Sequence, residues 1–210
     1  MDDDRTQKEH FNFDEIVELV RPNSKVLDLG CGDCTLLARL VGERGATARG
    51  VDIENAMLQR CIDRGVSVFH GDLDEGLKDH PTGSYDYVIL SRTLQMVHSP
   101  RFLLQEMIRV GNRVIVNFPN FAYVTNRLQL MLGGRMPVNS KFPYQWYNTP
   151  NIHFFTYRDF VVLCRELGVP ILKQVFLRNG RRVFGLLPNM FATEVRCLLD
   201  GESARPRRSV

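Results

Sequence analysis

The chain has 210 residues, of which 44% are hydrophobic and 24% charged, a balance that fits one globular domain and excludes a disordered or fibrous protein. Its 27 basic and 24 acidic residues leave a net charge of +3, which gives no indication of nucleic-acid binding. No apolar run approaches a membrane span, the polar start does not resemble a secretory signal, and five cysteines are too few for a disulfide framework. We therefore expect a cytoplasmic protein with reduced cysteines and no membrane contact.

Strand and helix patterns alternate through the first part of the chain. A helix is predicted at about residues 13–20, and short apolar runs predict strands at 25–29, 46–53, 66–70, 85–90 and 113–117. Helical spacing of apolar residues lies between these runs, at about 36–41, 55–64 and 102–109. This alternation predicts right-handed crossovers and a mostly parallel sheet with helices on both faces.

The last third of the chain departs from this rhythm. Thr156–Leu167 is predicted to be a helix, because Thr156 can cap its start and Gly168 follows its end. Two apolar runs, Ile171–Leu177 and Val183–Leu187, flank the pair Asn179-Gly180, which is the strongest short signal for a hairpin. The predicted fold class is therefore α/β, with a seven-stranded, mostly parallel, Rossmann-like sheet whose last strand is reversed.

A single domain is expected over residues 1–200, followed by a disordered basic tail at 201–210. Within the domain, residues 118–157 form an insertion that holds ten of the 20 aromatic residues. An insertion that follows the fifth strand would lie over the carboxyl ends of the strands, where ligands bind in such sheets. Two interpretations stay open: a substrate lid or protein interface, and a small satellite core that steadies the loop.

The segment that follows the first strand carries the strongest functional signal. Asp28 ends a buried run, Gly30 and Gly32 allow the backbone to pass close to a ligand, and a helix follows. Asp52 comes 20 residues after Gly32, at the end of the second strand, where a carboxylate accepts hydrogen bonds from ribose hydroxyls. This combination predicts a nucleoside-binding site.

These residues resemble the first motif of the class I S-adenosylmethionine-dependent methyltransferases, over about Lys25 to Leu187. One position departs from the motif, since Cys34 replaces its third glycine. The resemblance implies S-adenosylmethionine or S-adenosylhomocysteine as ligand, with Ser91 beside the methionine moiety and Leu73 against the adenine ring. The cofactor-binding residues that it implies are Asp28, Gly30, Gly32, Asp52, Ile53, Asp72, Leu73 and Ser91, with Asp72 accepting from the adenine amino group.

Within that superfamily the chain is similar to the MetW family of methionine-biosynthesis proteins. The residues that carry the similarity are the blocks 26–33, 50–53, 117–121 and 148–156. The resemblance implies a role beside homoserine O-acyltransferase, as a partner that supports or regulates it. The alternative is an active class I methyltransferase that acts on a small molecule, so whether the chain is an enzyme stays open.

The cysteines allow a competing interpretation of the same loop. Cys31 and Cys34 have the spacing of a redox pair at a helix start, although Asp33 would oppose a thiolate and the glycine pattern already accounts for the segment. Zinc would need about two more ligands. Cys61, Cys164 and Cys197 lie in helical patterns, where buried free thiols are expected, so no metal site is predicted.

No catalytic residue is assigned. The fourth predicted strand leads into Ser91-Arg92-Thr93-Leu94-Gln95, which lacks the Asn/Asp-Pro-Pro-Tyr sequence of many amino-group methyltransferases. His98 and His153 are candidate bases by residue type only. For His153, which lies just before the capped helix, a structural hydrogen bond is the favoured interpretation.

Overall fold

The computed structural model describes residues 13–139, 141–185 and 187–205. Its strands are β1 (Lys25–Leu29), β2 (Thr47–Asp52), β3 (Ser67–His70), β4 (Tyr85–Ser91), β5 (Gly111–Pro119), β6 (Ile171–Arg178), β7 (Arg181–Arg182) and β8 (Glu194–Asp200). Its helices are α1 (Asp14–Leu19), α2 (Thr35–Arg44), α3 (Asn55–Asp63), α4 (Pro100–Val110), α5 (Val124–Gly133), α6 (Tyr157–Glu166), α7 (Pro188–Phe191) and α8 (Gly201–Ala204), with a 3₁₀ turn η1 at Leu73–Glu75.

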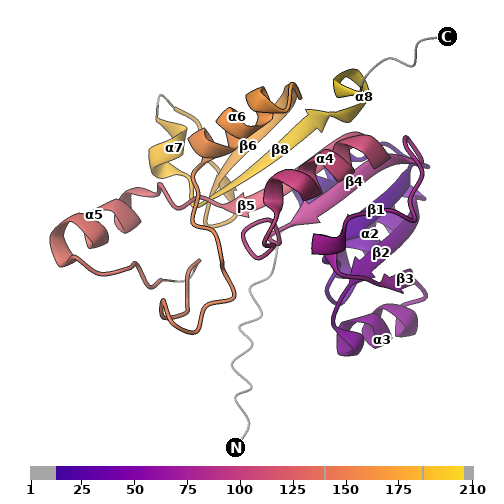
Figure 1. Ribbon diagram of the computed structural model, residues 1–210, viewed down its shortest axis with the longest axis horizontal. Coiled ribbons are helices and arrows are strands. Elements are labelled where there is room, and N and C mark those ends of the chain that lie inside the picture. The colour runs from indigo at the N-terminus through magenta and orange to yellow at the C-terminus, as the bar shows by residue number, and fades with distance from the viewer. Residues whose placement is uncertain (1–12, 140, 186, 206–210) are drawn as a thin grey trace, which may run out of the picture.

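The strands form one sheet in the order β3-β2-β1-β4-β5-β8-β6-β7 (Figure 1). Strands β1 to β5 are parallel, and β8 is antiparallel to both of its neighbours, β5 and β6. The α/β fold class is therefore confirmed, including a reversed last strand in chain order. The described part of the chain has eight strands in the sheet instead of the expected seven, because β8 was not predicted, while the hairpin strand after β6 shortens to the two-residue β7.

The predicted hairpin is present, but the strand expected after it is wrong. Asn179 and Gly180 both have positive φ, at 49° and 78°, and β6 turns back into β7. The pairing ends at Arg182, and no strand forms over the described residues of 183–187. Phe184 is 85% exposed. Strand β8 lies between β5 and β6 instead: all seven of its residues pair with β5, and six of them pair with β6.

Strand β8 is missing from the expectations drawn from sequence. Its residues Val195 and Cys197 alternate with the charged Glu194 and Arg196, but Leu198 and Leu199 are consecutive apolar residues that break the period of two. Glu194 and Arg196 are both buried. Strand β8 therefore lacks the row of exposed side chains that normally marks the solvent face of a strand in the sequence. The prediction of a helix around Cys197 is therefore wrong, whereas Cys61 and Cys164 do lie in helices, α3 and α6.

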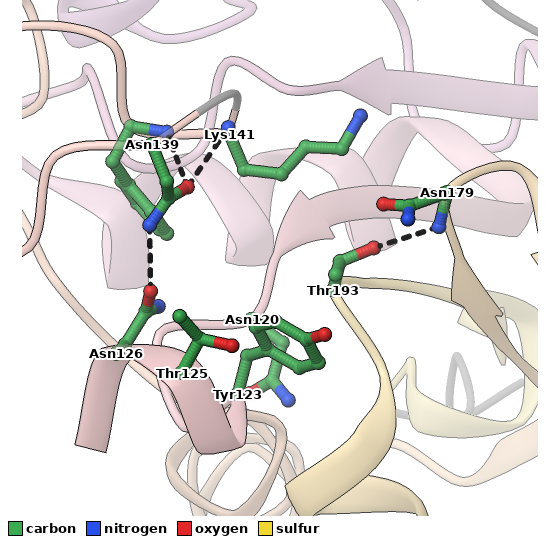
Figure 2. Close-up of a pocket in the computed structure, with 9 residues that line it drawn as sticks. Asn120, Tyr123, Thr125, Asn126, Asn139, Lys141, Asn179 and Thr193 are labelled. Carbon is green, nitrogen blue, oxygen red and sulfur yellow. Dashed lines mark hydrogen bonds between the residues drawn. The ribbon is translucent and has the colours of Figure 1, made fainter. Parts of the chain in front are cut away.

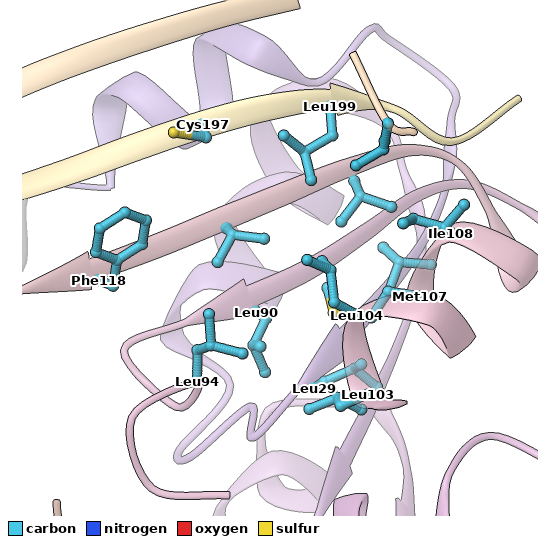
Figure 3. Packing of buried hydrophobic residues seen from close by; sticks show 14 of the residues in the cluster. Leu29, Leu90, Leu94, Leu103, Leu104, Met107, Ile108, Phe118, Cys197 and Leu199 are labelled. Atoms are coloured by element: carbon cyan, nitrogen blue, oxygen red, sulfur yellow. The ribbon is translucent and has the colours of Figure 1, made fainter. Parts of the chain in front are cut away.

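Each central strand sends alternate side chains into two cores, one on each face of the sheet. On one face, Leu29 and Leu90 lie beside Leu103 and Leu104 of α4 (Figure 3), and the same cluster includes Phe118 with Phe160 and Cys164 of α6. On the other face, Val26 and Ile89 pack against side chains of α1, α2 and α3. This arrangement confirms the expected helices on both faces, and it leaves the carboxyl ends of β1, β2 and β4 for the loops that carry the candidate site.

The end of the chain is more ordered than expected. Gly201–Ala204 form α8, and Gly201 is buried so tightly that a Cβ there would lie 2.4 Å from the carbonyl oxygen of Gly111. Arg205 donates to the carbonyl oxygens of Ile108 and Gly111, at 3.0 and 2.7 Å. The predicted start of a disordered tail at residue 201 is thus wrong for 201–205, and residues 206–210 lie outside the described residues. None of the helices that the structure describes has the length and apolar character needed to cross a membrane.

Candidate cofactor site

The glycine loop between β1 and α2 has three residues in left-handed conformation. The φ angles are 66° at Gly30, 53° at Gly32 and 58° at Cys34. A Cβ at Gly30 would lie 2.6 Å from Oγ1 of Thr93, so only glycine allows this loop to pass so close to the loop that follows β4. A Cβ at Gly32 would meet nothing within 4 Å, which leaves open space on that side of the loop for a ligand.

Asp52 holds the loop from the end of β2. Its Oδ2 accepts a hydrogen bond from the backbone N–H of Gly32 at 2.8 Å, and its Oδ1 accepts from Glu54 at 3.0 Å. The carboxylate therefore lies beside Gly32, at the place that the spacing predicts, with both oxygens at the carboxyl end of the strand. Ile53, which follows it, is 59% exposed.

Asp28 lies beneath this loop and is 3% exposed. Its Oδ1 is buried and has no hydrogen-bond partner among the described residues. Burial, followed by the nearby charge of Asp52, raises the pKa of Asp28 from 3.8 to about 8. A protonated carboxyl can donate a hydrogen bond as well as accept one, so Asp28 can orient polar groups at the loop.

The other predicted positions are distributed around the same edge of the sheet. Asp72 is exposed and caps η1, since its side chain accepts from the N–H of Asp74 at 2.9 Å. Leu73 is part of the buried core and is only 8% exposed. Ser91, at the end of β4, accepts a hydrogen bond from the side-chain amide of Asn117 at 3.0 Å.

These residues fit an adenosyl ligand. The open side of Gly32, the carboxylate of Asp52 and the buried, unpartnered oxygen of Asp28 lie at neighbouring strand ends, where an α/β sheet binds nucleotides. Gly30, Gly32, Asp28 and Asp52 could hold the ligand's ribose and methionine parts. The contacts expected of Ile53, Asp72, Leu73 and Ser91 remain predictions.

The cysteines around the loop differ from the expectation. Cys34 and Cys61 form a disulfide that joins the start of α2 to α3, so the prediction of a free thiol at Cys61 is wrong. The pairing also differs from the Cys31–Cys34 redox alternative, because Cys31 stays free. Sequence could not reveal this pair, since its members lie 27 residues apart and meet only when α3 packs beside the loop.

The histidines give no catalytic pair. His98 has a largely exposed side chain whose Nδ1 lies 2.9 Å from Oδ2 of Asp74. His153 donates from its backbone N–H to the carbonyl oxygen of Gln95 at 3.0 Å, while its ring Nε2 is buried without a hydrogen-bond partner in the described part of the chain. This backbone bond does not test the structural hydrogen bond expected of the His153 ring, which stays a prediction.

Sequence reasoning also missed a buried charge cluster near the ends of β4 and β5. Arg92, in left-handed conformation after β4, donates to Glu194 Oε2 at 2.6 Å, and Arg196 lies 3.5 Å from the other oxygen. Burial alone would raise the pKa of Glu194, but the charges and hydrogen bonds of Arg92 and Arg196 outweigh it and lower the pKa. The cluster fixes β8 to the loop after β4.

A separate polar cavity of about 180 Å³ lies between the start of α5 and the β6–β7 turn (Figure 2). Asn126 accepts from the side-chain amide of Asn139 at 2.8 Å, and Thr193 accepts from the N–H of Asn179 at 3.2 Å. Asn120, which is fully buried, bonds to the carbonyl oxygens of Asn189 and Ala192. These bonds give the cavity a structural role in anchoring the insertion.

The insertion contains a small aromatic core and also exposes apolar side chains. Phe121, Phe142 and Phe154 form a satellite cluster with ring centroids 5.0 to 5.9 Å apart. Other apolar side chains face solvent along α5 and after it, where the chain extends away from the sheet (Figure 1). The returning segment lies against the loop after β4, because Ile152 and His153 both donate to the carbonyl oxygen of Gln95.

Comparison with known proteins identifies the family. The family model described as methionine biosynthesis protein MetW matches residues 10–198. The chain belongs to the MetW family. It is also 40% identical over 185 residues to the bifunctional methionine biosynthesis protein MetXA/MetW of Rhodopirellula baltica. That match covers 82% of this chain but only 30% of the relative, so the chain spans less than a third of the relative's length.

Solved structures confirm the fold of this MetW family member. A methyltransferase from Archaeoglobus fulgidus, described as dependent on S-adenosylmethionine, has a TM-score of 0.64 at 16% identity, covering 89% of this chain and 90% of that one. The [4+2]-cyclase SpnF has a TM-score of 0.65 at 14% identity, with 89% and 80% covered. The same fold therefore occurs in a methyltransferase and in a cyclase, and it does not by itself determine the reaction.

Proposed function

We propose that the chain binds S-adenosylmethionine or S-adenosylhomocysteine and acts as a cytoplasmic partner of homoserine O-acyltransferase in methionine biosynthesis. The observation that carries the proposal is the relative whose name joins MetXA and MetW in one protein. We assign the MetXA part to the acyltransferase. A fusion keeps two domains at high effective concentration, which favours even a weak functional contact between them.

The exposed apolar surface of the insertion supports a protein contact. Met131 and Leu132 on α5 are 71% and 78% exposed, and Trp146 and Tyr147 are 71% and 70% exposed. Leu132 also lines a groove of about 480 Å³ formed largely by apolar side chains of α5 and the residues directly after it. Exposed aromatic and apolar side chains of this kind are typical of the centre of protein interfaces.

Co-purification with the homoserine O-acyltransferase of the same organism, with an activity assay of that enzyme, tests the partner role. We expect the chain to bind the acyltransferase and to change its activity. Leu132→Asp should abolish both effects, because it places a charge in the apolar surface. Val162→Asp is the matched control, since Val162 is 51% exposed on α6, outside the insertion. Equal binding by both variants would refute the assigned surface, and no binding by the native chain would refute the partner role.

Calorimetry with S-adenosylhomocysteine tests the ligand site separately. Asp52→Ala should weaken binding by about 1–3 kcal/mol, the range for loss of hydrogen bonds to a charged group. Asp79→Ala removes an exposed carboxylate from another loop and should leave binding unchanged. No heat with the native chain at millimolar ligand would refute the site while leaving the partner role open to the previous test.

The second candidate function is methyl transfer to a small molecule. It is favoured by the glycine loop and Asp52, whose geometry fits the ligand of the methyltransferases that share this fold. Incubation with methyl-labelled S-adenosylmethionine and a metabolite extract should then give a labelled small-molecule product. Labelled product that disappears in the Asp52→Ala variant would support this function over a purely accessory one.

A further inference from the structure

Three cysteine sulfurs gather under the candidate ligand loop. The sulfur atoms of Cys31, Cys34 and Cys61 all lie within 4.8 Å of one another, and all three residues are buried. Cys34 and Cys61 are joined, and Cys31 is free. The disulfide thus connects the loop that would hold the ligand to α3, the helix that follows Asp52.

We propose that Cys34 and Cys61 are a reversible thiol–disulfide pair that fixes the glycine loop against α3 and so increases the affinity for the adenosyl ligand. The inference rests on the ligand site proposed above. When the bond closes, the two thiols lose two hydrogen atoms to a disulfide oxidant, which becomes two thiols. When it opens, a dithiol supplies the two hydrogen atoms and becomes a disulfide. In the reducing compartment proposed for this chain, a disulfide is most often catalytic or redox-sensing.

The backbone at Cys34 explains why the bond would affect ligand binding. Cys34 has a φ of 58°, a conformation that side chains disfavour and that glycine adopts freely. The disulfide holds the residue in this conformation, at the N-cap of α2. Once the bond opens, the loop can relax toward the conformations that a cysteine prefers. The ligand must then order the loop again, which lowers its affinity.

The free thiol of Cys31 is a poor candidate to attack the Cys34–Cys61 disulfide. Burial, then the charges of Asp28 and Asp52, raise the pKa of Cys31 to about 12. A thiol that stays protonated at neutral pH is a poor nucleophile, so Cys31 does not exchange with the disulfide. Cys34 and Cys61 have no exposed surface, so an external dithiol can reach them only when α3 separates from the loop. A bound ligand should therefore slow reduction.

Mass spectrometry and calorimetry on the full chain test the proposal. Alkylation under denaturing conditions should find three free thiols in the oxidised protein and five after treatment with a dithiol, with the bridging peptides containing Cys34 and Cys61. The oxidised protein should bind S-adenosylhomocysteine at least about fivefold more tightly than the reduced protein, the lower end of typical allosteric couplings. By reciprocity, saturating ligand should shift the thiol–disulfide equilibrium by the same factor.

Two variants separate the disulfide from the loop conformation. Cys34→Gly restores the residue that tolerates positive φ, so it should bind tightly whether or not a dithiol is present. Cys61→Ser should bind like the reduced protein under all conditions. Cys164→Ala is the control, because Cys164 lies in the core on the other face of the sheet and should leave the redox dependence unchanged.

Several outcomes would overturn the proposal. Equal affinities of the oxidised and reduced native proteins would do so, as would five free thiols after exposure to an oxidant. A thiol-bound metal ion in the protein as isolated would instead assign the three cysteines to a cation site. If no form binds S-adenosylhomocysteine, the proposed ligand site has failed, and hydrogen exchange of residues 30–35 decides about the disulfide. Faster exchange of these residues after reduction would support the proposal that the disulfide fixes the glycine loop. Unchanged exchange would refute that proposal.

Discussion

Replacing Asp28 by Asn should make the protein more stable at neutral pH. Asp28 is buried and its pKa is about 8, whereas an ordinary aspartate has a pKa of 3.8. Between these two values the folded protein keeps a proton that the unfolded chain releases, so the free energy of unfolding falls as the pH rises. An asparagine has the shape of the protonated acid and carries no such penalty.

The size of the effect follows from the two pKa values. Each unit corresponds to 1.36 kcal/mol, so the variant should gain about 2 kcal/mol over the native protein at pH 5 and about 5 kcal/mol at pH 8. Urea unfolding followed by circular dichroism at several pH values measures this difference. Titrating groups that do not interact with Asp28 contribute equally to both proteins, so the comparison isolates residue 28 together with its coupling to Asp52.

The control is Asp79→Asn, which removes an exposed carboxylate and should change stability far less than Asp28→Asn. A constant difference between Asp28→Asn and the native protein from pH 5 to pH 8 would refute the reasoning. It would mean that Asp28 is ionised in the folded protein and is stabilised by contacts that balance its burial.

Three further changes test the packing around the site by urea unfolding. Glu194→Gln should cost about 3–5 kcal/mol, because it leaves the buried charge of Arg196 without its carboxylate. Since the pKa of Glu194 is lowered, its contribution should be present above an ordinary pKa of 4.5 and lost as the pH falls through the folded value. Phe118→Ala should cost about 3–5 kcal/mol, as Phe118 is fully buried. Thr156→Ala should cost about 1 kcal/mol, because Thr156 and Asp159 form the capping box of α6.

Each of these three predictions has a contrary result. A Glu194→Gln variant as stable as the native protein would mean that Arg92 and Arg196 relax into solvent. A loss below about 1 kcal/mol for Phe118→Ala would mean that neighbouring side chains fill the space, against the usual behaviour of a fully buried phenylalanine. An unchanged Thr156→Ala variant would show that packing alone determines where α6 begins.

Local chemistry made much of the structure predictable. The positive φ angles that Asn179-Gly180 requires, and the cap at Thr156, are both found in the structure. The glycine loop and Asp52 meet as the spacing of 20 residues predicts, and their hydrogen bond confirms the geometry. The turn and the cap depend on residues that are adjacent in sequence. The contact between the glycine loop and Asp52 depends on a single strand–helix–strand unit, whose geometry is known in advance.

The features that sequence did not predict depend on long-range contacts. Strand β8 contains Glu194 and Arg196, which look solvent-facing until Arg92, about 100 residues earlier, completes their buried cluster. The disulfide likewise needs α3 to pack against the start of α2 before its two sulfurs can meet. In each case the deciding partner is distant in the chain, and no periodic pattern marks it.

The candidate ligand site and the apolar surface of the insertion are physically connected. Gly30 passes so close to Thr93 that no side chain fits between them, and Gln95, two residues later, accepts hydrogen bonds from Ile152 and His153 of the insertion. A ligand that orders the glycine loop therefore also acts on the loop after β4, and through it on the segment that returns from the apolar surface. Coupling between two binding sites is reciprocal. If the ligand changes the affinity of this chain for the acyltransferase by some factor, an acyltransferase bound at α5 should change the affinity for the ligand by the same factor. This short contact route supports the proposed regulation of a partner.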